Sequence, residues 1–324
     1  MNECDVKLYW LFPETYQELY RQRWARYYDK HRQAAAINGF DFQVATVDDI
    51  QIIADGSRKR AFIKGVDADP ESTLIHNKVY PWPTFQLDIW RYVALCDQLK
   101  YAGYPCIVRT DLNLMANDKM ASLLALGAVA RPVLPTVSIF TRDFDDINPS
   151  LLESAGIGYP VVVKPAHWAK GMGVVRAYDE AQLVMALRLA AASELTMIVQ
   201  PMLDIVADIR VYCIDGTPKY GQARKIGRNR TVANTTSGGT YELGDVPEYL
   251  MERTRKVADV LDTPWLGVDY LQTADETYFS EVEIDAGLPV SDPMTLPILT
   301  ERFASYRRLF DGGFFAAHAN APDR

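Results

Sequence analysis

The sequence contains little cysteine and little histidine, and neither residue falls into a catalytic or metal-binding pattern. Its four cysteines lie far apart in the chain without a C-x-x-C pair, and its four histidines are equally scattered. This spacing argues against a disulfide framework, a cysteine-based zinc site and histidine-centred catalysis. Reduced thiols in a cytoplasmic protein are the simplest interpretation.

Long apolar runs and an excess of positive charge are also absent. Among the 324 residues no stretch reaches the roughly 18 consecutive apolar residues of a membrane span. The acidic N-terminus, with only a short apolar run, argues against a secretory signal. The net charge of −8, from 34 basic and 42 acidic residues, is a poor basis for binding a nucleic-acid backbone. We therefore expect a cytoplasmic protein that binds neither membranes nor nucleic acid.

Composition and periodicity instead indicate a globular α/β protein. Hydrophobic residues make up 48% of the chain and charged residues 23%, and the length suits two to three domains. A strand at Val6–Phe12, a helix over residues 14–36 and a strand at Phe40–Val47 form the strand–helix–strand unit of a parallel sheet. The pattern also predicts a helix at Phe85–Tyr101 and a short buried strand at Cys106–Thr110.

Helix caps and turn residues organise the rest of the chain. Asp118 can cap a helix at Lys119–Leu126, Asp215-Gly216 favours a β-hairpin, and a further helix is predicted at Glu248–Leu261. The residues after Asp311 are small and polar, so we expect a frayed tail.

One lysine ends a valine-rich strand immediately before a glycine-containing loop. Lys164 closes the run Val161–Pro165, and the loop that follows contains Lys170, Gly171 and Gly173. A charge at the end of a buried strand is costly without a partner, and backbone N–H groups in such a loop can hold a polyphosphate. An ordinary hairpin with exposed lysines stays open as the alternative.

Four acidic residues near the C-terminal end form a second pattern. Asp269 lies on one predicted strand, and Glu281, Glu283 and Asp285 alternate on the next. Alternation puts these three carboxylates on one face, where a cation such as Mg²⁺ would relieve their repulsion. A solvent-facing acidic edge strand is the alternative.

Basic residues gather between these two patterns, which is notable in an acidic chain. The residues are Arg210, Arg224, Lys225, Arg228 and Arg230. They favour a place for phosphates or substrate carboxylates, although a solvated basic loop stays open for Arg228 and Arg230.

The order of these motifs resembles the ATP-grasp superfamily and, within it, the RimK-like carboxylate–amine ligases. The resemblance runs from about Asn117 to Leu288. It implies an α/β (α+β) ATP-grasp fold with a preceding N-terminal α/β domain, and a nucleotide held between two α+β subdomains. The expected parts are an N-terminal domain, a central subdomain with the phosphate lid loop, a C-terminal subdomain with the metal site, and a tail, at residues 1–112, 113–200, 201–312 and 313–324.

The resemblance also implies roles for individual residues. ATP would be bound by two lysines, the lid loop, the adenine hinge and a ribose-binding acid: Lys119, Lys164, Lys170, Gly171, Gly173, Gln200, Pro201, Met202, Leu203 and Asp208. One or two Mg²⁺ ions, with Mn²⁺ as a substitute, would be bound by Asp269, Glu281 and Glu283. The catalytic positions facing the γ-phosphate and the acyl intermediate would be Arg210, Arg224, Lys225 and Asn234.

Two positions depart from the RimK-like pattern. Glu283 stands where these enzymes usually have asparagine, which adds a negative charge to the metal site. Val232 stands where they usually have arginine, two residues before Asn234, so the substrate end of the site is expected to differ.

The activity implied is ATP-dependent amide-bond formation through an acyl phosphate, with release of ADP and phosphate. The substrates would be small carboxylates and amines, such as amino acids or peptides. A small-molecule kinase and a non-catalytic nucleotide-binding protein are the alternatives, and an acceptor that is a thiol or a carrier-protein amine is also left open. The sequence leaves the substrates' identity and any homo-oligomeric state open.

Overall fold

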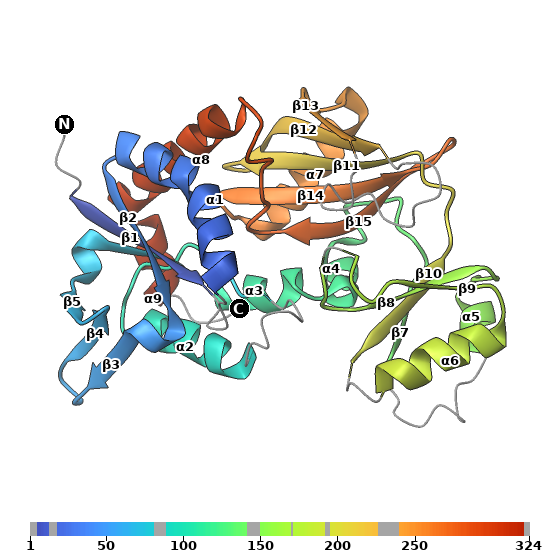
Figure 1. The fold of residues 1–324 in the computed structure, drawn as a ribbon, viewed down its shortest axis with the longest axis horizontal. Helices are drawn as coiled ribbons and strands as arrows, with labels where there is room; N and C mark the ends of the chain where they lie inside the picture. Colours follow the sequence, from blue (N-terminus) through green and yellow to red (C-terminus); the bar gives the residue numbers. More distant parts are fainter. Residues whose placement is uncertain are drawn as a thin grey trace.

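The computed structural model describes residues 5–12, 18–80, 89–140, 150–169, 171–191, 195–225 and 240–320. Figure 1 shows the N-terminal sheet at one end of the long axis and a four-stranded sheet at the other, with a five-stranded sheet between these ends. Among the described residues, no helix is both long and apolar enough to cross a membrane.

The N-terminal part is built on a three-stranded parallel sheet in the order β2-β1-β6. Its strands are β1 (Val6–Phe12), β2 (Phe40–Thr46) and β6 (Thr73–His76). Helix α1 (Glu18–Ile37) connects β1 to β2, so the predicted strand–helix–strand unit is confirmed. The segment before β6 forms an antiparallel sheet and two short 3₁₀ turns: η1 (Val47–Asp49), β3 (Ile50–Ala54), β4 (Lys59–Ile63), β5 (Val66–Ala68) and η2 (Pro70–Ser72).

The strand predicted at Cys106–Thr110 is wrong. Cys106 forms only an isolated bridge with Ile75, and a helix begins at Thr110. The reason is a side-chain amide: Val108 donates its N–H to Asn77 Oδ1 at 2.9 Å, and its carbonyl accepts from Asn77 Nδ2 at 2.8 Å. Val108 therefore satisfies its backbone groups without a neighbouring strand.

Three helices lie between β6 and the four-stranded sheet in chain order. They are α2 (Ile89–Tyr101), α3 (Thr110–Ala116) and α4 (Lys119–Leu126). Helix α2 confirms the described part of the helix predicted at Phe85–Tyr101, while residues 85–88 lie outside the described ranges. Asp118 caps α4 as predicted, because its side chain accepts a hydrogen bond from the N–H of Ala121 at 2.8 Å.

The four-stranded sheet is antiparallel, in the order β7-β10-β8-β9. Its strands are β7 (Val137–Ile139), β8 (Val161–Pro165), β9 (Val175–Ala177) and β10 (Met197–Pro201). Helices α5 (Ser150–Ser154) and α6 (Glu180–Ala191) lie beside it (Figure 1). Leu152, Leu183 and Leu187 from these helices join Val161 and Val163 in a separate core.

The five-stranded sheet is also antiparallel, in the order β13-β12-β11-β14-β15. Its strands are β11 (Ala207–Ile214), β12 (Thr217–Lys225), β13 (Thr240–Gly244), β14 (Trp265–Gln272) and β15 (Thr277–Glu283). Asp215 and Gly216 both have left-handed φ angles, 49° and 73°, which confirms the predicted hairpin turn. Helix α7 (Glu248–Leu261) packs on the sheet over the range predicted for it.

The chain ends on two helices that return to the N-terminal part, α8 (Thr295–Asp311) and α9 (Phe314–Asn320) (Figure 1). The expected frayed tail is therefore wrong for residues 314–320. Phe315 is only 1% exposed, and its ring meets Tyr306 edge-on with the ring centroids 6.4 Å apart. Burial of this ring stabilises a helix that a small polar composition alone would leave frayed.

A buried arginine on α8 joins the N-terminal sheet to the five-stranded sheet. Arg302 is 1% exposed, and its guanidinium lies 5.1 Å from the ring centroid of Trp10 in β1 and 4.7 Å from that of Trp265 in β14. It donates to Asp285 Oδ1 at 2.8 Å and to Tyr306 Oη at 2.7 Å. These rings belong to one continuous hydrophobic core, so the Arg302 guanidinium places a positive charge inside that core.

We expect Arg302→Met to lower the free energy of unfolding by about 3–5 kcal/mol, because it removes a buried guanidinium that pairs with the Asp285 carboxylate. Equilibrium urea unfolding followed by circular dichroism measures the change. The matched control is Arg308→Met on the same helix, which removes an exposed ion pair with Asp215 and should cost less than about 1 kcal/mol. Equal losses in the two variants would contradict this account of the core.

Candidate active site

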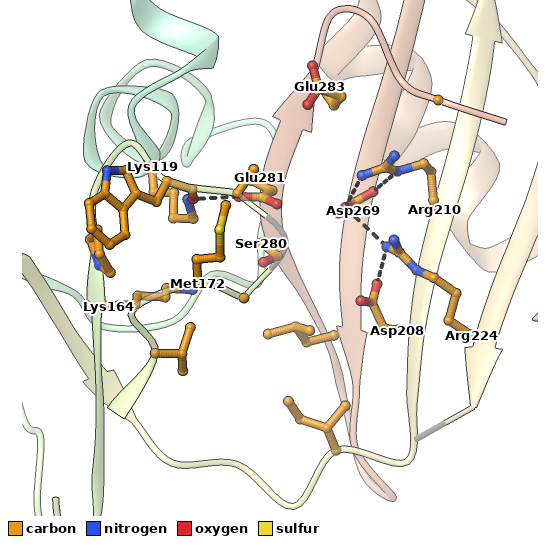
Figure 2. A pocket seen from close by; sticks show the side chains of 18 of the residues that line it. Lys119, Lys164, Met172, Asp208, Arg210, Arg224, Asp269, Ser280, Glu281 and Glu283 are labelled. Carbon is orange, nitrogen blue, oxygen red and sulfur yellow. Dashed lines mark hydrogen bonds and ion pairs between the residues drawn. The ribbon is translucent and has the colours of Figure 1, made fainter. Parts of the chain in front are cut away.

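A cavity of about 440 Å³ is lined by both larger sheets and by the N-terminal part. The N-terminal part contributes Phe12 and Tyr80, and the sheets contribute side chains from β8, β10, β11, β12, β14 and β15. Figure 2 shows Lys119 and Lys164 on one side, and Asp208, Arg210, Arg224 and Asp269 on the other. Charged groups of both signs therefore face a common space.

Lys164 reaches this space because of the alternation of its strand. Val161 and Val163 are fully buried in the core of the four-stranded sheet, so Lys164 points to the opposite face. Within the described part of the chain, its amine has no hydrogen-bond or ion-pair partner. Burial and the nearby Lys119 ammonium lower the pKa of Lys164 to about 8, although the carboxylates of Glu281 and Asp208 act to raise it. A half-buried amine of this kind favours an anionic ligand.

Lys119 lies at the start of α4 and connects three elements. Its Nζ is 3.4 Å from Glu281 Oε2 and also donates to the carbonyl of Trp168. Its backbone N–H donates to the carbonyl of Ala166 at 2.9 Å. The beginning of α4, the segment after β8 and the acidic strand β15 are therefore joined through one residue.

The loop after β8 needs glycine at two of the predicted positions. Gly171 and Gly173 have φ angles of 71° and 70°, which residues with a Cβ adopt at a cost. A Cβ on Gly173 would lie 2.7 Å from Pro165 Cγ, so the loop also packs too closely for a side chain there. Gly171 lines the cavity, while Lys170 lies outside the described residues.

The segment expected to contact adenine lies at the C-terminal end of β10, the strand that pairs with β8. Gln200, Pro201, Met202 and Leu203 all face the cavity. Gln200 donates through its side-chain nitrogen to Thr136 Oγ1 at 2.8 Å, and the N–H of Met202 donates to the carbonyl of Pro160 at 3.0 Å. These bonds fix the course of the backbone at the end of β10.

Two arginines and two aspartates form a compact cluster on the five-stranded sheet. Arg210 donates to both oxygens of Asp269, at 2.6 and 2.7 Å. Arg224 donates to Asp208 at 2.6 Å and to Asp269 at 3.1 Å (Figure 2). The arrangement follows from the register, which pairs Arg210 with Asp269 and Asp208 with Arg224 on neighbouring strands.

The two aspartates of this cluster differ in their electrostatics. Burial raises the pKa of Asp208 to about 6 against the opposing effect of Arg224. Burial also acts on Asp269, but Arg210 and Arg224 together hold the pKa of Asp269 below its ordinary value. Arg224 Nε is buried and has no partner among the described residues, so the cluster retains donor capacity for an anion.

The three alternating acids each have a cation of their own. Glu281 pairs with Lys119, and Glu283 pairs with the buried Lys78. Asp285, two residues beyond, accepts from Arg302 and, at 2.6 Å, from the hydroxyl of Tyr80. Burial opposes ionisation, but His76 and Arg302 hold the pKa of Asp285 far below its ordinary value. The sequence pattern found these acids but not their partners.

The donor set fits a divalent cation that shares its coordination with phosphates. Within the described residues, no three acidic, histidine or cysteine side chains converge on one point where they could hold a metal ion. Glu281 and Glu283 nevertheless line the cavity, and neither Glu281 Oε1 nor Glu283 Oε2 accepts a hydrogen bond from the described residues. One or two carboxylates plus substrate phosphates is the coordination that Mg²⁺ prefers.

Most of the predicted site residues therefore line one cavity. Those that do are Lys119, Lys164, Gly171, Gln200, Pro201, Met202, Leu203, Asp208, Arg210, Arg224, Asp269, Glu281 and Glu283. Gly173 packs behind the cavity wall, and Asn234 and the side chains of Lys170 and Lys225 lie outside the described part of the chain. Sequence reasoning missed Lys78 and Arg302, whose partners are 205 and 17 residues away along the chain.

Comparison with known proteins identifies the family. A family model described as a RimK-like ATP-grasp domain matches residues 116–298, more than half of this 324-residue chain. The methylcrotonoyl-CoA carboxylase subunit alpha of Glycine max is 31% identical over 159 residues, which is 46% of this chain but 20% of that protein. The coenzyme gamma-F420-2:alpha-L-glutamate ligase of Methanocaldococcus jannaschii is 28% identical over 230 residues, 67% of this chain and 75% of that protein.

Solved structures agree on the fold. D-cycloserine synthetase DcsG superimposes with a TM-score of 0.64 at 17% identity, covering 94% of this chain and 99% of that one. The ATP-grasp ligase PsnB, complexed with a minimal precursor, gives a TM-score of 0.61 at 13% identity, covering 94% and 100%. The expected ATP-grasp fold is thus confirmed, and this chain belongs to the family of RimK-like ATP-grasp domains.

Proposed function

We propose that this protein is an ATP-dependent carboxylate–amine ligase that forms an amide bond and releases ADP and phosphate. The observation that carries the proposal is the amine of Lys164, which has no partner among the described residues and lines one cavity with the acids of β15. Such a site holds positive charge for phosphates and hard oxygens for a divalent cation at the same time. Membership of the RimK-like family supports amino acids or small peptides as substrates.

ATP would lie between the two larger sheets. Lys119, Lys164, Lys170 and the backbone N–H groups of the glycine loop would bind its phosphates. The main chain of residues 200–203 would contact the adenine, and Asp208 the ribose hydroxyls. Closure of the glycine loop would exclude water from the reacting groups.

A divalent cation would be bound by Glu281 and Glu283, and it would neutralise charge on the phosphates when bound. Asp269 is a third ligand by the same proposal. Both of its oxygens accept hydrogen bonds from Arg210 and Arg224, so it becomes available only as those guanidinium groups turn toward an anionic substrate.

The basic residues of the five-stranded sheet would stabilise the reacting groups. A substrate carboxylate attacks the γ-phosphorus of ATP, ADP leaves, and an amine then attacks the acyl phosphate and displaces phosphate. Arg210, Arg224, Lys225 and Asn234 would stabilise the charge that develops on the transferred phosphoryl group and on the tetrahedral intermediate. This mechanism requires positioning and charge stabilisation but no covalent nucleophile.

We propose separate roles for the three main parts of the chain. Residues 113–200 and 201–312 would form the two subdomains that enclose ATP, and residues 1–112 would shape the substrate end. We also propose that the protein acts in the cytoplasm.

ADP release and the mass of the product test this function. We expect ADP release with ATP, Mg²⁺ and pooled amino acids and small carboxylates, and a product mass equal to two substrates minus water. A product heavier by one phosphate group would instead identify a kinase. ATP binding without ADP release from any pool would favour a non-catalytic nucleotide-binding protein.

We expect Lys164→Ala to weaken ATP binding and abolish turnover, because it removes a cation that has no partner among the residues the structure describes. The pKa of about 8 adds a pH dependence. The amine loses its charge as pH rises through that value, so ATP affinity should fall about tenfold between roughly pH 7 and pH 9. Lys164→Arg, which stays charged, is the control and should show little change over that interval. Isothermal titration calorimetry with ATP measures both effects, and unaltered affinity in Lys164→Ala would contradict the phosphate site.

We expect Glu281→Gln to lose Mg²⁺-dependent turnover by about 100-fold while it stays folded, because the substitution keeps the shape but removes a charged ligand. ADP release measured against Mg²⁺ concentration, with circular dichroism as the control for folding, tests this. Wild-type turnover of the variant at limiting Mg²⁺ would show that Glu281 does not bind the cation.

A further inference from the structure

Lys78 is a charged residue that the molecule buries almost completely. It is 2% exposed, and its ammonium forms an ion pair with Glu283 of β15, 205 residues away along the chain. Lys78 is not among the described residues that line the cavity, whereas Glu283 is. Burying an ammonium is costly unless an anion compensates it, and here that anion is the Glu283 carboxylate. Lys78 can therefore affect the cavity through the position and charge of Glu283.

An amide clamp fixes the backbone on both sides of Lys78. The side chain of Asn113 donates to the carbonyl of Asn77 at 2.8 Å and accepts from the N–H of Val79 at 2.9 Å. Asn77 in turn pairs with both backbone groups of Val108. Both amides are buried, so the segment 77–79 cannot shift without breaking several buried hydrogen bonds.

The clamp gives Glu283 one held oxygen and one open oxygen. Oε1 accepts from Lys78 and from the N–H of Asp285 at 3.3 Å. Oε2 accepts no hydrogen bond from the described residues, and the side chain lines the cavity. The ion pair therefore orients the carboxylate and at the same time cancels its charge.

We propose that Lys78 is a positioning residue for the divalent cation, holding Glu283 by Oε1 so that only Oε2 is presented and the acidic strand carries no surplus negative charge. The inference rests on the proposed role of Glu283 as a metal ligand. Without Lys78, Glu283 is free to offer both oxygens, and the site gains one unit of negative charge. A cation should then bind more tightly to the nucleotide-free protein.

Calorimetric titration of the nucleotide-free protein with Mn²⁺ tests this without any turnover. We expect Lys78→Met to tighten Mn²⁺ binding about tenfold. In the Glu283→Gln background the same Lys78→Met change should alter affinity by less than about twofold, because no carboxylate is released. Equal changes in the two backgrounds, or no change in the single variant, would overturn the proposal.

Two further variants guard the result against effects on folding. Lys78→Gln keeps most of the side-chain length and a hydrogen-bond donor, and it should tighten Mn²⁺ binding in the same direction as Lys78→Met. Lys219→Met is the matched control, since it removes a surface lysine paired with Glu301 and should leave Mn²⁺ affinity unchanged. A change as large in Lys219→Met as in the Lys78 variants would also overturn the proposal.

Mn²⁺ binding and amide formation report separately on Lys78 and on the ligase activity. Loss of the coupling between Lys78 and Glu283 in a protein that still forms an amide would reject the role of Lys78 alone. Coupling in Mn²⁺ binding without any amide product would support Lys78 and reject the ligase.

Discussion

The need to neutralise three partly buried acids organises this molecule more than any other constraint. Glu281, Glu283 and Asp285 follow one another at every second position, and like charges at such spacing repel unless each is compensated. The cations come from three different places in the chain: Lys119 at the start of α4, Lys78 after β6, and Arg302 in α8. The acidic strand can be stable only when the N-terminal part, the central helices and the C-terminal helix are all assembled around it.

The same electrostatic balance leaves some charged groups of the cavity without a partner among the described residues. The acids of β15 and the aspartates of the arginine cluster all have partners, but Lys164 has none among the described residues, and Arg224 Nε also lacks one. A polyanion that arrives with its own divalent cation brings negative charge to the side that lacks it, and positive charge to the side that has open carboxylate oxygens. The protein's own charges thus suit the metal-bound nucleotide of the proposed function.

The sequence predicted local features well and long-range partners poorly. The β1–α1–β2 unit, the Asp215-Gly216 turn and the helix at Glu248–Leu261 rest on short-range periodicity and turn chemistry, which a single sequence carries. Val108 looked like part of a strand because no pattern reveals that the Asn77 amide satisfies its backbone. Phe315 shows the same limit, because its burial depends on Tyr306 of another helix.

In the site too, the sequence predicted the motif residues but not their long-range partners. The motif order, through its resemblance to the ATP-grasp pattern, located the cavity-lining residues from Lys119 to Glu283. It could not show that the unusual acid Glu283 has a lysine of its own. Since Lys78 is buried and held by an amide clamp, the extra carboxylate does not make the site more acidic than its cations allow. A substitution within a motif can thus be balanced by a residue outside it, and only the folded chain brings the two together.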